Sequence, residues 1–156
     1  MLPRDYRDQR CSIAKALEVV GDRWTMLIMR EVFSGTRRFE QFLGNLGIAR
    51  TVLTERLARL VEDGLLVKER YHLRPERFEY LLTEKGTDLW PVLMALLVWG
   101  DRHAIDGPPP VIVTHRACGG QLNDRRMCTR CGQPLGPDDV WGNFNPALAN
   151  AGSGRP

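Results

Sequence analysis

The chain has 156 residues, which fits one domain of ordinary size together with a small appendage. Hydrophobic residues make up 43% of it and charged residues 26%, so the composition is that of a folded globular protein and excludes a largely disordered chain. A net charge of +3 is too small to identify a nucleic-acid-binding protein by itself. No stretch approaches the roughly 18 apolar residues that a membrane span requires, and residues 1–10 are polar, so we expect a cytoplasmic protein that does not associate with membranes.

Apolar residues at helical spacing predict three helices in the first 46 residues. The first helix is expected to begin near Ser12 and to end at Gly21. Asp22 is the expected N-cap of the second helix, which Ser34-Gly35 ends. The third covers residues 39–46, where Phe39, Phe42, Leu43 and Leu46 fall at i, i+3, i+4 and i+7.

A fourth helix, at about residues 49–63, follows the interruption at Gly47-Ile48. Its apolar face is formed by Leu53, Leu57, Leu60 and Val61. Two amphipathic helices joined through a glycine turn are typical of a helix-turn-helix, in which the second helix reads DNA.

The pattern then changes to one of β-forming residues, in 65–71 and again in 78–83. The polar segment 72–76 lies between them and contains Pro75, so it predicts the tip of a hairpin. A hairpin that follows a helix-turn-helix is a wing, here about residues 65–83.

A long helix holding Leu89 to Trp99 is expected next, although Pro91 leaves its start open. Its apolar stripe is wider than a small core needs, which suggests a subunit interface. Trp24, Trp90 and Trp99 stand at helical spacing within apolar runs, so we expect them in the core rather than around an effector.

The segment Gly107 to Pro110 forms a stiff break after this helix. The sequence therefore predicts a DNA-binding and dimerisation domain over 1–106, a zinc-ribbon-like appendage over 107–142 and a disordered tail over 143–156. The expected fold class is mainly α with a small β-hairpin wing (α+β), a winged helix-turn-helix.

A recognition helix needs exposed side chains at its N-terminal end, opposite the face that packs on the domain. With Leu53 at the centre of the buried face, rotation by about 100° per residue places Thr51, Thr54 and Glu55 on the far side, as candidates for base contacts. Glu55 could accept a hydrogen bond from cytosine or could pair with Arg59. The phosphate candidates on this helix are Arg50, Arg56 and Arg59.

Further cationic residues lie on the predicted wing and before the third helix. Arg74, Arg77 and His72 would lie along the DNA backbone or the minor groove, and Arg37 and Arg38 would anchor the start of the third helix. Any one of these arginines could equally be a solvated surface residue. Their common placement favours DNA.

Several short blocks of this sequence resemble the HxlR family of regulators, in the same order. They are Cys11-Ser12-Ile13, Gly21-Asp22-Arg23-Trp24-Thr25, Arg38-Phe39-Glu40-Gln41-Phe42, Gly47-Ile48, Val52-Leu53-Thr54-Glu55-Arg56-Leu57, Glu62-Asp63-Gly64-Leu65, Glu79-Tyr80, Leu82-Thr83-Glu84-Lys85-Gly86 and Trp99-Gly100. The resemblance covers residues 10–103 and departs at Ala49, where such proteins often carry a capping serine. It implies a homodimer built from the first and last helices of the domain, which presents two recognition helices to an inverted repeat.

The same resemblance implies a role for Cys11, because some members of the family sense oxidants or electrophiles through a cysteine before the first helix. A helix N-terminus and the neighbouring Arg10 would both favour the thiolate. The alternative is that Cys11 packs as a small apolar residue.

The other three cysteines belong to two short pairs, His115-x-x-Cys118 and Cys128-x-x-Cys131, each followed by glycine. Two-residue spacing lets a tight turn aim both ligands at one ion, and Zn²⁺ accepts three thiolates and an imidazole tetrahedrally. Four protein ligands would make the site closed and structural. The alternatives are a ribbon that has lost its metal and a Cys128/Cys131 dithiol that oxidises.

The sequence thus predicts a transcription regulator, most simply a repressor, that binds double-stranded DNA as a homodimer and responds to thiol oxidation or a small molecule. The alternative is a protein–protein adaptor on the same scaffold, since a fold does not determine a function. No catalytic motif is recognisable, so we do not expect an enzyme.

Overall fold

The computed structural model describes residue 6 and residues 8–145. The chain divides into two compact units, Met1–Thr87 and Asp88–Pro156, which we describe separately. The long helix that follows residue 87 belongs to the second unit. The expected boundary near residue 107, between this helix and the appendage, stays a prediction. Most of the tail expected to be disordered, from residue 146 onward, lies outside the described residues.

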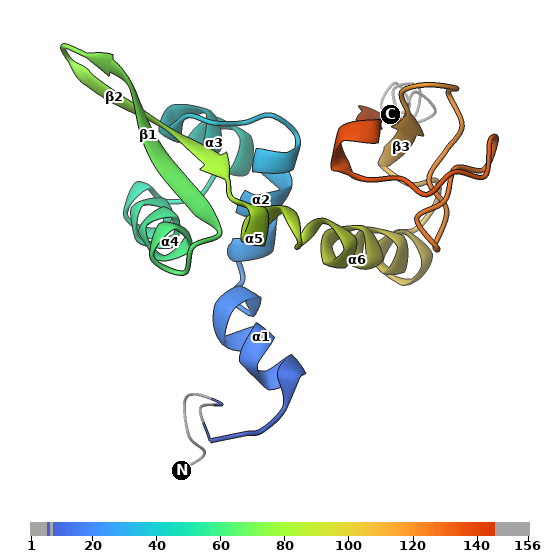
Figure 1. Ribbon diagram of the computed structural model, residues 1–156, viewed down its shortest axis with the longest axis horizontal. Coiled ribbons are helices and arrows are strands. Elements are labelled where there is room, and N and C mark those ends of the chain that lie inside the picture. Colours follow the sequence, from blue (N-terminus) through green and yellow to red (C-terminus); the bar gives the residue numbers. More distant parts are fainter. Residues whose placement is uncertain (1–5, 7, 146–156) are drawn as a thin grey trace, which may run out of the picture. The chain divides into compact units, whose positions relative to one another are not determined.

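The first unit is a winged helix-turn-helix (Figure 1). Its elements are α1 (Ser12–Val20), α2 (Thr25–Phe33), α3 (Phe39–Leu46), α4 (Arg50–Glu62), β1 (Leu66–Leu73), β2 (Glu76–Leu82) and α5 (Glu84–Thr87). The expected helices and hairpin are therefore confirmed. The short helix α5 is not expected from the sequence, which predicts that this region leads directly into the long helix.

The turns around α2 and α3 show why the elements end where they do. Gly47 closes α3 in the left-handed conformation, with φ 61°, which suits glycine because it has no Cβ. The expectation that Asp22 is the N-cap of α2 was wrong by two residues. The N-cap is Trp24, and the Asp22 carboxylate accepts a hydrogen bond from the Trp24 N–H at 3.0 Å in the turn before the helix.

The core of this unit is formed by the apolar faces that the helical periodicity predicted. The fully buried side chains include Ile28 and Met29 of α2, Phe42 of α3, and Leu53 and Leu57 of α4. Burying side chains of this size stabilises a fold by roughly 1.5 to 3 kcal/mol each. The helices α2, α3 and α4 thus each contribute a buried face to one core.

The wing is an antiparallel hairpin in which Leu66 pairs with Leu82 and Leu73 with Glu76 (Figure 1). Both strands extend further toward the tip than the sequence predicted, so the turn consists of Arg74 and Pro75 only. Arg38 also pairs with Glu79 of β2 in an isolated β-bridge, so the segment before α3 lies alongside the hairpin. The hairpin is thereby attached to the helix-turn-helix.

The second unit combines one long helix with a small β-structure. Its elements are α6 (Trp90–His103), β3 (Val111–His115), a 3₁₀ turn (Pro137–Asp139) and β4 (Val140–Phe144), with β3 and β4 antiparallel. Pro91 stands in the first turn of α6, where no N–H is needed, which answers the question of where this helix starts. Isolated bridges, such as Leu122 with Cys128, tie the intervening loops together.

Among residues 6 and 8–145 no helix is long and apolar enough to cross a membrane.

Candidate DNA-binding surface and metal centre

The outer face of α4 carries the residues predicted to read bases. Thr51, Thr54 and Glu55 are exposed, while Leu53 and Leu57 on the opposite face are buried. The Thr54 hydroxyl donates to the Arg50 carbonyl at 2.9 Å, which leaves its methyl group and an oxygen lone pair directed outward. This face is free to approach base edges in a major groove.

The three arginines of α4 differ in how firmly they are held. Arg50 makes an exposed two-pronged pair with Glu40, at 3.0 and 3.1 Å, and a phosphate could compete for such a pair. Arg59 pairs with Asp63 at 3.4 Å, and a Glu55–Arg59 pair is not among the contacts of the described residues.

Arg56 is the exception, because its guanidinium is turned inward. It lies 2.8 Å from the Asp22 carboxylate in the turn between α1 and α2, and its Nε is buried with no hydrogen-bond partner among the described residues. Asp22 therefore joins the recognition helix to the turn after α1. An arginine engaged in this way is a poor candidate for a phosphate contact.

The wing tip carries exposed cations. Arg74 and Arg77 are exposed and make no side-chain hydrogen bond or ion pair with any residue that the structure describes. His72 is held in the turn, where its Nδ1 lies 2.9 Å from the Pro75 carbonyl, and Arg70 pairs with Glu76 at 2.8 Å. Two unpaired arginines at the end of a hairpin suit a DNA backbone.

Arg37 and Arg38 connect the wing to α3. The Tyr80 N–H donates to the Arg37 carbonyl at 2.8 Å, and the Arg38 guanidinium lies 4.5 Å from the centre of the Tyr71 ring. The Gln41 side chain accepts from both backbone N–H groups. Both side chains remain exposed, so they can meet phosphate while their backbone positions the wing.

A buried carboxylate that the sequence reasoning missed lies behind this surface. Glu31 of α2 is 8% exposed and accepts hydrogen bonds from Arg30, Thr36 and Asn45, at 2.8, 3.1 and 2.7 Å. Burial by itself raises the pKa of Glu31, but these hydrogen bonds outweigh it and the pKa lies below its ordinary value. A single charged residue in a helix gives no sequence signal of such a network.

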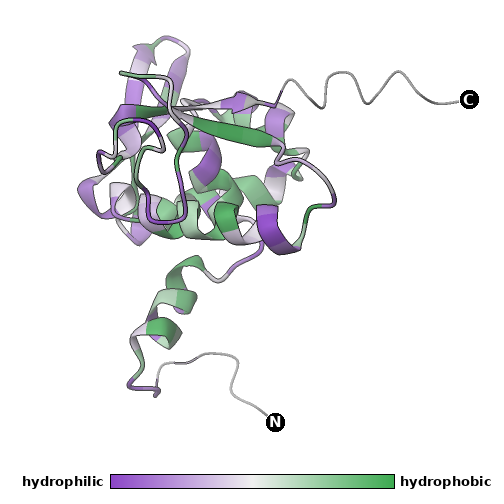
Figure 2. Ribbon diagram, turned by 90° about the vertical axis from the view of Figure 1, so that its right-hand side faces the viewer, coloured by the Kyte–Doolittle hydropathy of each residue, from purple (hydrophilic) through white to green (hydrophobic). Residues whose placement is uncertain are grey.

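Two helices expose apolar side chains. On α1, Ile13 and Leu17 are 72% and 46% exposed, and in Figure 2 this helix, next to the N-terminal end, is coloured mostly as hydrophobic. On α6, Leu96 and Trp99 are 51% and 61% exposed. The expectation that Trp99 lies in the core was wrong, whereas Trp90 is buried as predicted. Exposed apolar helix faces of this kind mark interfaces.

Cys11 is exposed and is the N-cap residue of α1. It therefore does not pack as a small apolar residue within the described part of the chain.

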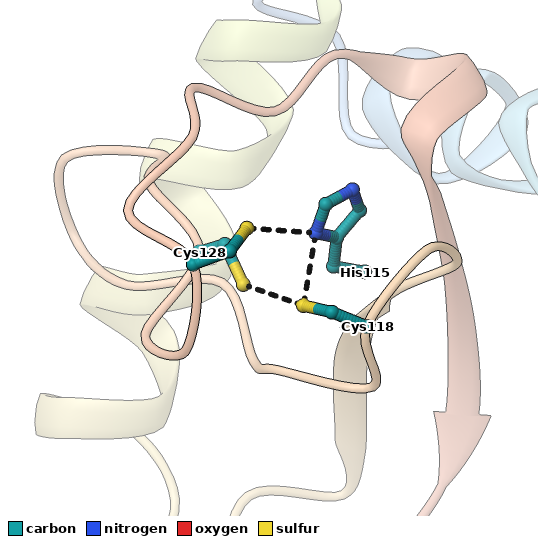
Figure 3. Close-up of side chains that lie close together, drawn as sticks. His115, Cys118 and Cys128 are labelled. Carbon is teal, nitrogen blue, oxygen red and sulfur yellow. Dashed lines mark hydrogen bonds between the residues drawn. The ribbon is translucent and has the colours of Figure 1, made fainter.

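The metal-ligand candidates of the second unit come together. The ligand atoms of His115, Cys118, Cys128 and Cys131 all lie within 4.8 Å of one another. Figure 3 shows the side chains of His115, Cys118 and Cys128 close together. Cys118 Sγ lies 3.3 Å from His115 Nδ1 and 3.4 Å from Cys128 Sγ, and Cys131 Sγ lies 3.4 Å from His115 Nδ1. His115 and Cys128 are buried, Cys118 is half-buried and Cys131 is exposed, so the cluster is covered on one side and open to water at Cys131.

Two turns of the same construction present these ligands. The Gly119 N–H donates to the His115 carbonyl and the Gly132 N–H to the Cys128 carbonyl, at 2.9 and 3.0 Å. Both glycines adopt positive φ, 74° and 72°, which few other residues could do. Gly120 also lies so close to Cys128 that a Cβ there would clash with the sulfur.

The pKa values of two thiols in the cluster are shifted in opposite directions. The backbone N–H groups of Cys131 and Arg130 lower the pKa of Cys128 to about 6, although burial opposes them. The Gly120 N–H acts on Cys118 in the same way, but burial and the neighbouring thiols outweigh it and raise the pKa of Cys118. The donor set and its spacing fit one tetrahedral divalent cation, which would relieve this repulsion.

The helix-turn-helix, its wing and the exposed face of α4 together define a winged helix-turn-helix DNA-binding protein. Residues 19–107 match the family model described as HxlR-like helix-turn-helix, which is more than half of the chain. The chain belongs to this family, and it is a DNA-binding transcription regulator.

Its curated relatives are regulators of the same kind. The chain is 47% identical over 132 residues to Rv3095 of Mycobacterium tuberculosis, an uncharacterized HTH-type transcriptional regulator, covering 83% of each chain. It is 33% identical over 92 residues to YybR of Bacillus subtilis, which has the same description, covering 58% of this chain and 74% of the relative. The match to Rv3095 covers 132 residues, which is more than the 107 residues up to the end of the family match, so it extends into the C-terminal part of the chain.

Solved structures that resemble this chain are also described as transcription factors or regulators. PA1607, a candidate transcription factor, is 33% identical with a TM-score of 0.68, and the match covers 85% of this chain and 94% of that one. The redox regulator HypR in its reduced form is 30% identical with a TM-score of 0.58, covering 60% of this chain and 94% of that one.

Proposed function

We propose that the chain is a cytoplasmic repressor that binds an inverted-repeat operator as a homodimer. The observation that carries this proposal is the exposed N-terminal face of α4, with Thr51, Thr54 and Glu55, beside a wing whose Arg74 and Arg77 have no partner among residues 6 and 8–145. The α4 face suits base edges in the major groove, and the wing suits the backbone or minor groove. The supporting phosphate contacts are Arg37, Arg38, Arg50, Arg59 and His72.

The homodimer is supported by the exposed apolar residues of α1 and α6. Ile13, Leu17, Leu96 and Trp99 would each leave a large apolar surface in water if the chain remained a monomer. A second copy with the same two helices can cover these residues through a self-complementary contact. Two copies related by a twofold axis then require an inverted repeat in the DNA.

We propose that His115, Cys118, Cys128 and Cys131 bind a structural Zn²⁺. All four positions of a tetrahedral ion would be filled by protein, so no reacting water is needed and no enzymatic activity follows. The donor set supports zinc over magnesium or calcium, which prefer oxygen ligands. The metal content of the purified protein, with Cys118→Ser as the comparison, tests this directly: one zinc per chain is expected, and less in the variant.

The regulator's signal is proposed to act at Cys11. An exposed thiol at the start of a helix is accessible to oxidants, and one structural relative, HypR, is described as a redox regulator. The alternative sensor is the Cys128/Cys131 pair, which oxidation could form into a disulfide only with loss of the metal site.

The testing experiment selects bound sequences from a random duplex pool with reduced, zinc-loaded protein and repeats the selection after mild peroxide treatment. An enriched inverted repeat is expected, and its loss after oxidation in the wild type but not in Cys11→Ser would assign the sensor to Cys11. A pool with no enriched sequence would contradict operator binding and revive the adaptor interpretation. Loss of affinity with rising salt distinguishes DNA binding from adaptor behaviour.

A further inference from the structure

The second unit contains a cavity of about 520 Å³ between α6 and the β-structure that carries the metal-ligand candidates. A volume of this size lies within the range that small-molecule sites occupy. Its apolar wall is formed by Leu97 and Val98 of α6, Ile112 of β3, and Leu122. The lining lies wholly within one compact unit, so the cavity does not depend on how the two units are arranged.

The helix α6 has two different faces. Leu97, Val98 and Asp101 lie on the side that faces this cavity, whereas Leu96 and Trp99 are exposed on the other side. The rotation of about 100° per residue separates the two groups, so one helix can serve a cavity and a subunit interface at once. The cavity is therefore distinct from the surface proposed for dimerisation.

The charges that line the cavity are two carboxylates and one guanidinium. Arg102 and Asp124 form a loose ion pair, with 3.7 Å between Nη2 and Oδ2, and both are more than half exposed. Asp101 has no hydrogen bond or ion pair with any residue in the described part of the chain. The cavity is thus left with one carboxylate, that of Asp101, which pairs with no cation of the residues that the structure describes.

The surroundings of Asp101 make this charge significant. Burial raises the pKa of Asp101, which means that its carboxylate is partly withdrawn from water without compensation. A cation placed beside it would regain the lost interaction, and the apolar wall would accept a hydrocarbon or aromatic body. An anion would meet repulsion at Asp101, and a neutral ligand would leave that carboxylate unpaired.

We propose that this cavity is a binding site for an amphipathic organic cation, an amine whose ammonium group pairs with Asp101 while its apolar body lies against α6 and β3. This is a ligand site separate from the DNA-binding surface and from the metal centre. Its occupation would link the β-structure to α6, the helix that also carries the proposed interface. The inference does not rest on operator binding.

The test compares three probes with one apolar body: 4-phenylbutylamine, 4-phenylbutan-1-ol and 4-phenylbutyrate. Binding to the zinc-loaded full chain without DNA is measured by titration calorimetry and by amide chemical shifts. The amine is expected to bind about five- to tenfold tighter than the alcohol, and the carboxylate weakest, because one charge-assisted contact contributes roughly that factor. The shifted amides should lie in residues 97–102 and 111–124.

Asp101→Asn removes the charge with little change in shape, and Asp138→Asn removes an exposed carboxylate outside the cavity. The first variant should lose the preference for amine over alcohol while its alcohol affinity stays unchanged, which also shows that the cavity is intact. The second should bind all three probes as the wild type does. Equal affinity for amine and alcohol in the wild type, or an unchanged preference in Asp101→Asn, would overturn the proposal.

Discussion

Charged residues of the winged helix-turn-helix serve two different purposes that their sequence positions do not distinguish. Glu31 and Arg56 are turned inward and join elements together, through Asn45 and Asp22. Arg74 and Arg77 are exposed and unpaired within the described residues. A charge that is satisfied inside the protein supports the fold, whereas an unsatisfied exposed charge is available to DNA.

Replacing Glu31 with Gln should destabilise the protein by about 1 to 3 kcal/mol at pH 7, because hydrogen bonds to a buried charged acceptor are weakened. The lowered pKa of Glu31 means that the folded state favours the carboxylate. Its stabilisation is therefore full above the ordinary glutamate pKa, about 4.3, and is lost as pH falls through the lower folded value.

Thermal unfolding at several pH values checks this prediction. The difference in Tm between wild type and Glu31→Gln should shrink toward pH 3, while the exposed Glu62→Gln control stays close to wild type throughout. A difference that is the same at pH 7 and pH 3 would contradict the role assigned to the Glu31 charge.

Asp22→Ala and Arg56→Ala should both destabilise the protein, since each removes one partner of the same ion pair, and Asp22→Ala should cost more because it also removes the acceptor of the Trp24 N–H. A double-mutant cycle by denaturant unfolding measures their coupling, expected near 1 kcal/mol for a partly buried pair. If Arg56 contacts phosphate instead, only Arg56→Ala will reduce the salt dependence of operator binding, by about one unit of slope. That outcome would restore the sequence-based assignment of Arg56.

At the scale of elements, α4 and the wing divide recognition between them. The face of α4 is set by the buried positions Leu53 and Leu57, and the wing is held by its bridge to the segment before α3. A helix held by its buried face can read bases, whereas arginines at a hairpin tip that contact phosphate supply affinity without reading sequence.

Thr54→Ala should relax base preference at one position in each half-site, with discrimination falling by about 1 to 3 kcal/mol. Arg74→Ala should weaken binding to all duplexes alike and lower the salt slope by about one. Competition assays on the selected operator and its single-base variants measure both. An equal loss on every sequence for the two variants would refute this division of roles.

The two ligand turns of the β-structure hold the proposed metal site, and we expect the folding of this element to depend on the ion. The segment of residues 107–145 buries few large apolar side chains, Val113, Leu135 and Val140 among them. A module of this size seldom folds on its core alone.

Metal removal by a chelator should therefore unfold residues 107–145 while leaving unit Met1–Thr87 folded. Amide hydrogen exchange checks this, with protection lost around His115 and Cys128 but kept in α2 and α4. Restored protection after zinc is added back is the control. Unchanged protection in metal-free protein would show that the cluster is not a structural metal site.

At the scale of the whole molecule, two compact units carry separate surfaces. The first holds the DNA-reading face, and the second holds α6, the metal-ligand cluster and the cavity beside Asp101. The helices with exposed apolar residues, α1 and α6, belong to different units. A dimer built on both would involve each unit in the interface.

Leu96→Glu should shift the protein from dimer to monomer, because a buried unpaired charge costs several kcal/mol at an interface. Light scattering during size-exclusion chromatography measures the mass. Leu73→Glu makes the same change at an exposed leucine of the wing tip and should remain dimeric. A dimer in both variants would place the interface elsewhere.

Much of the fold was determined by the sequence alone, because it depends on short-range patterns. Helical spacing located α1 to α4 and α6, alternation and turn residues located the wing, and the spacing of His115, Cys118, Cys128 and Cys131 predicted the cluster. Periodicity and ligand spacing are local properties that a chain carries with it into any fold.

Only the tertiary structure decided which charges are satisfied and which apolar residues are covered. Periodicity put Trp99 in a core, but no neighbouring element covers it among the described residues. No local pattern indicated that Arg56 pairs with Asp22, and its predicted phosphate contact stays a prediction. Glu31 and Asp101 gave no signal at all. Burial and pairing depend on residues far apart in the chain, and a local pattern does not contain them.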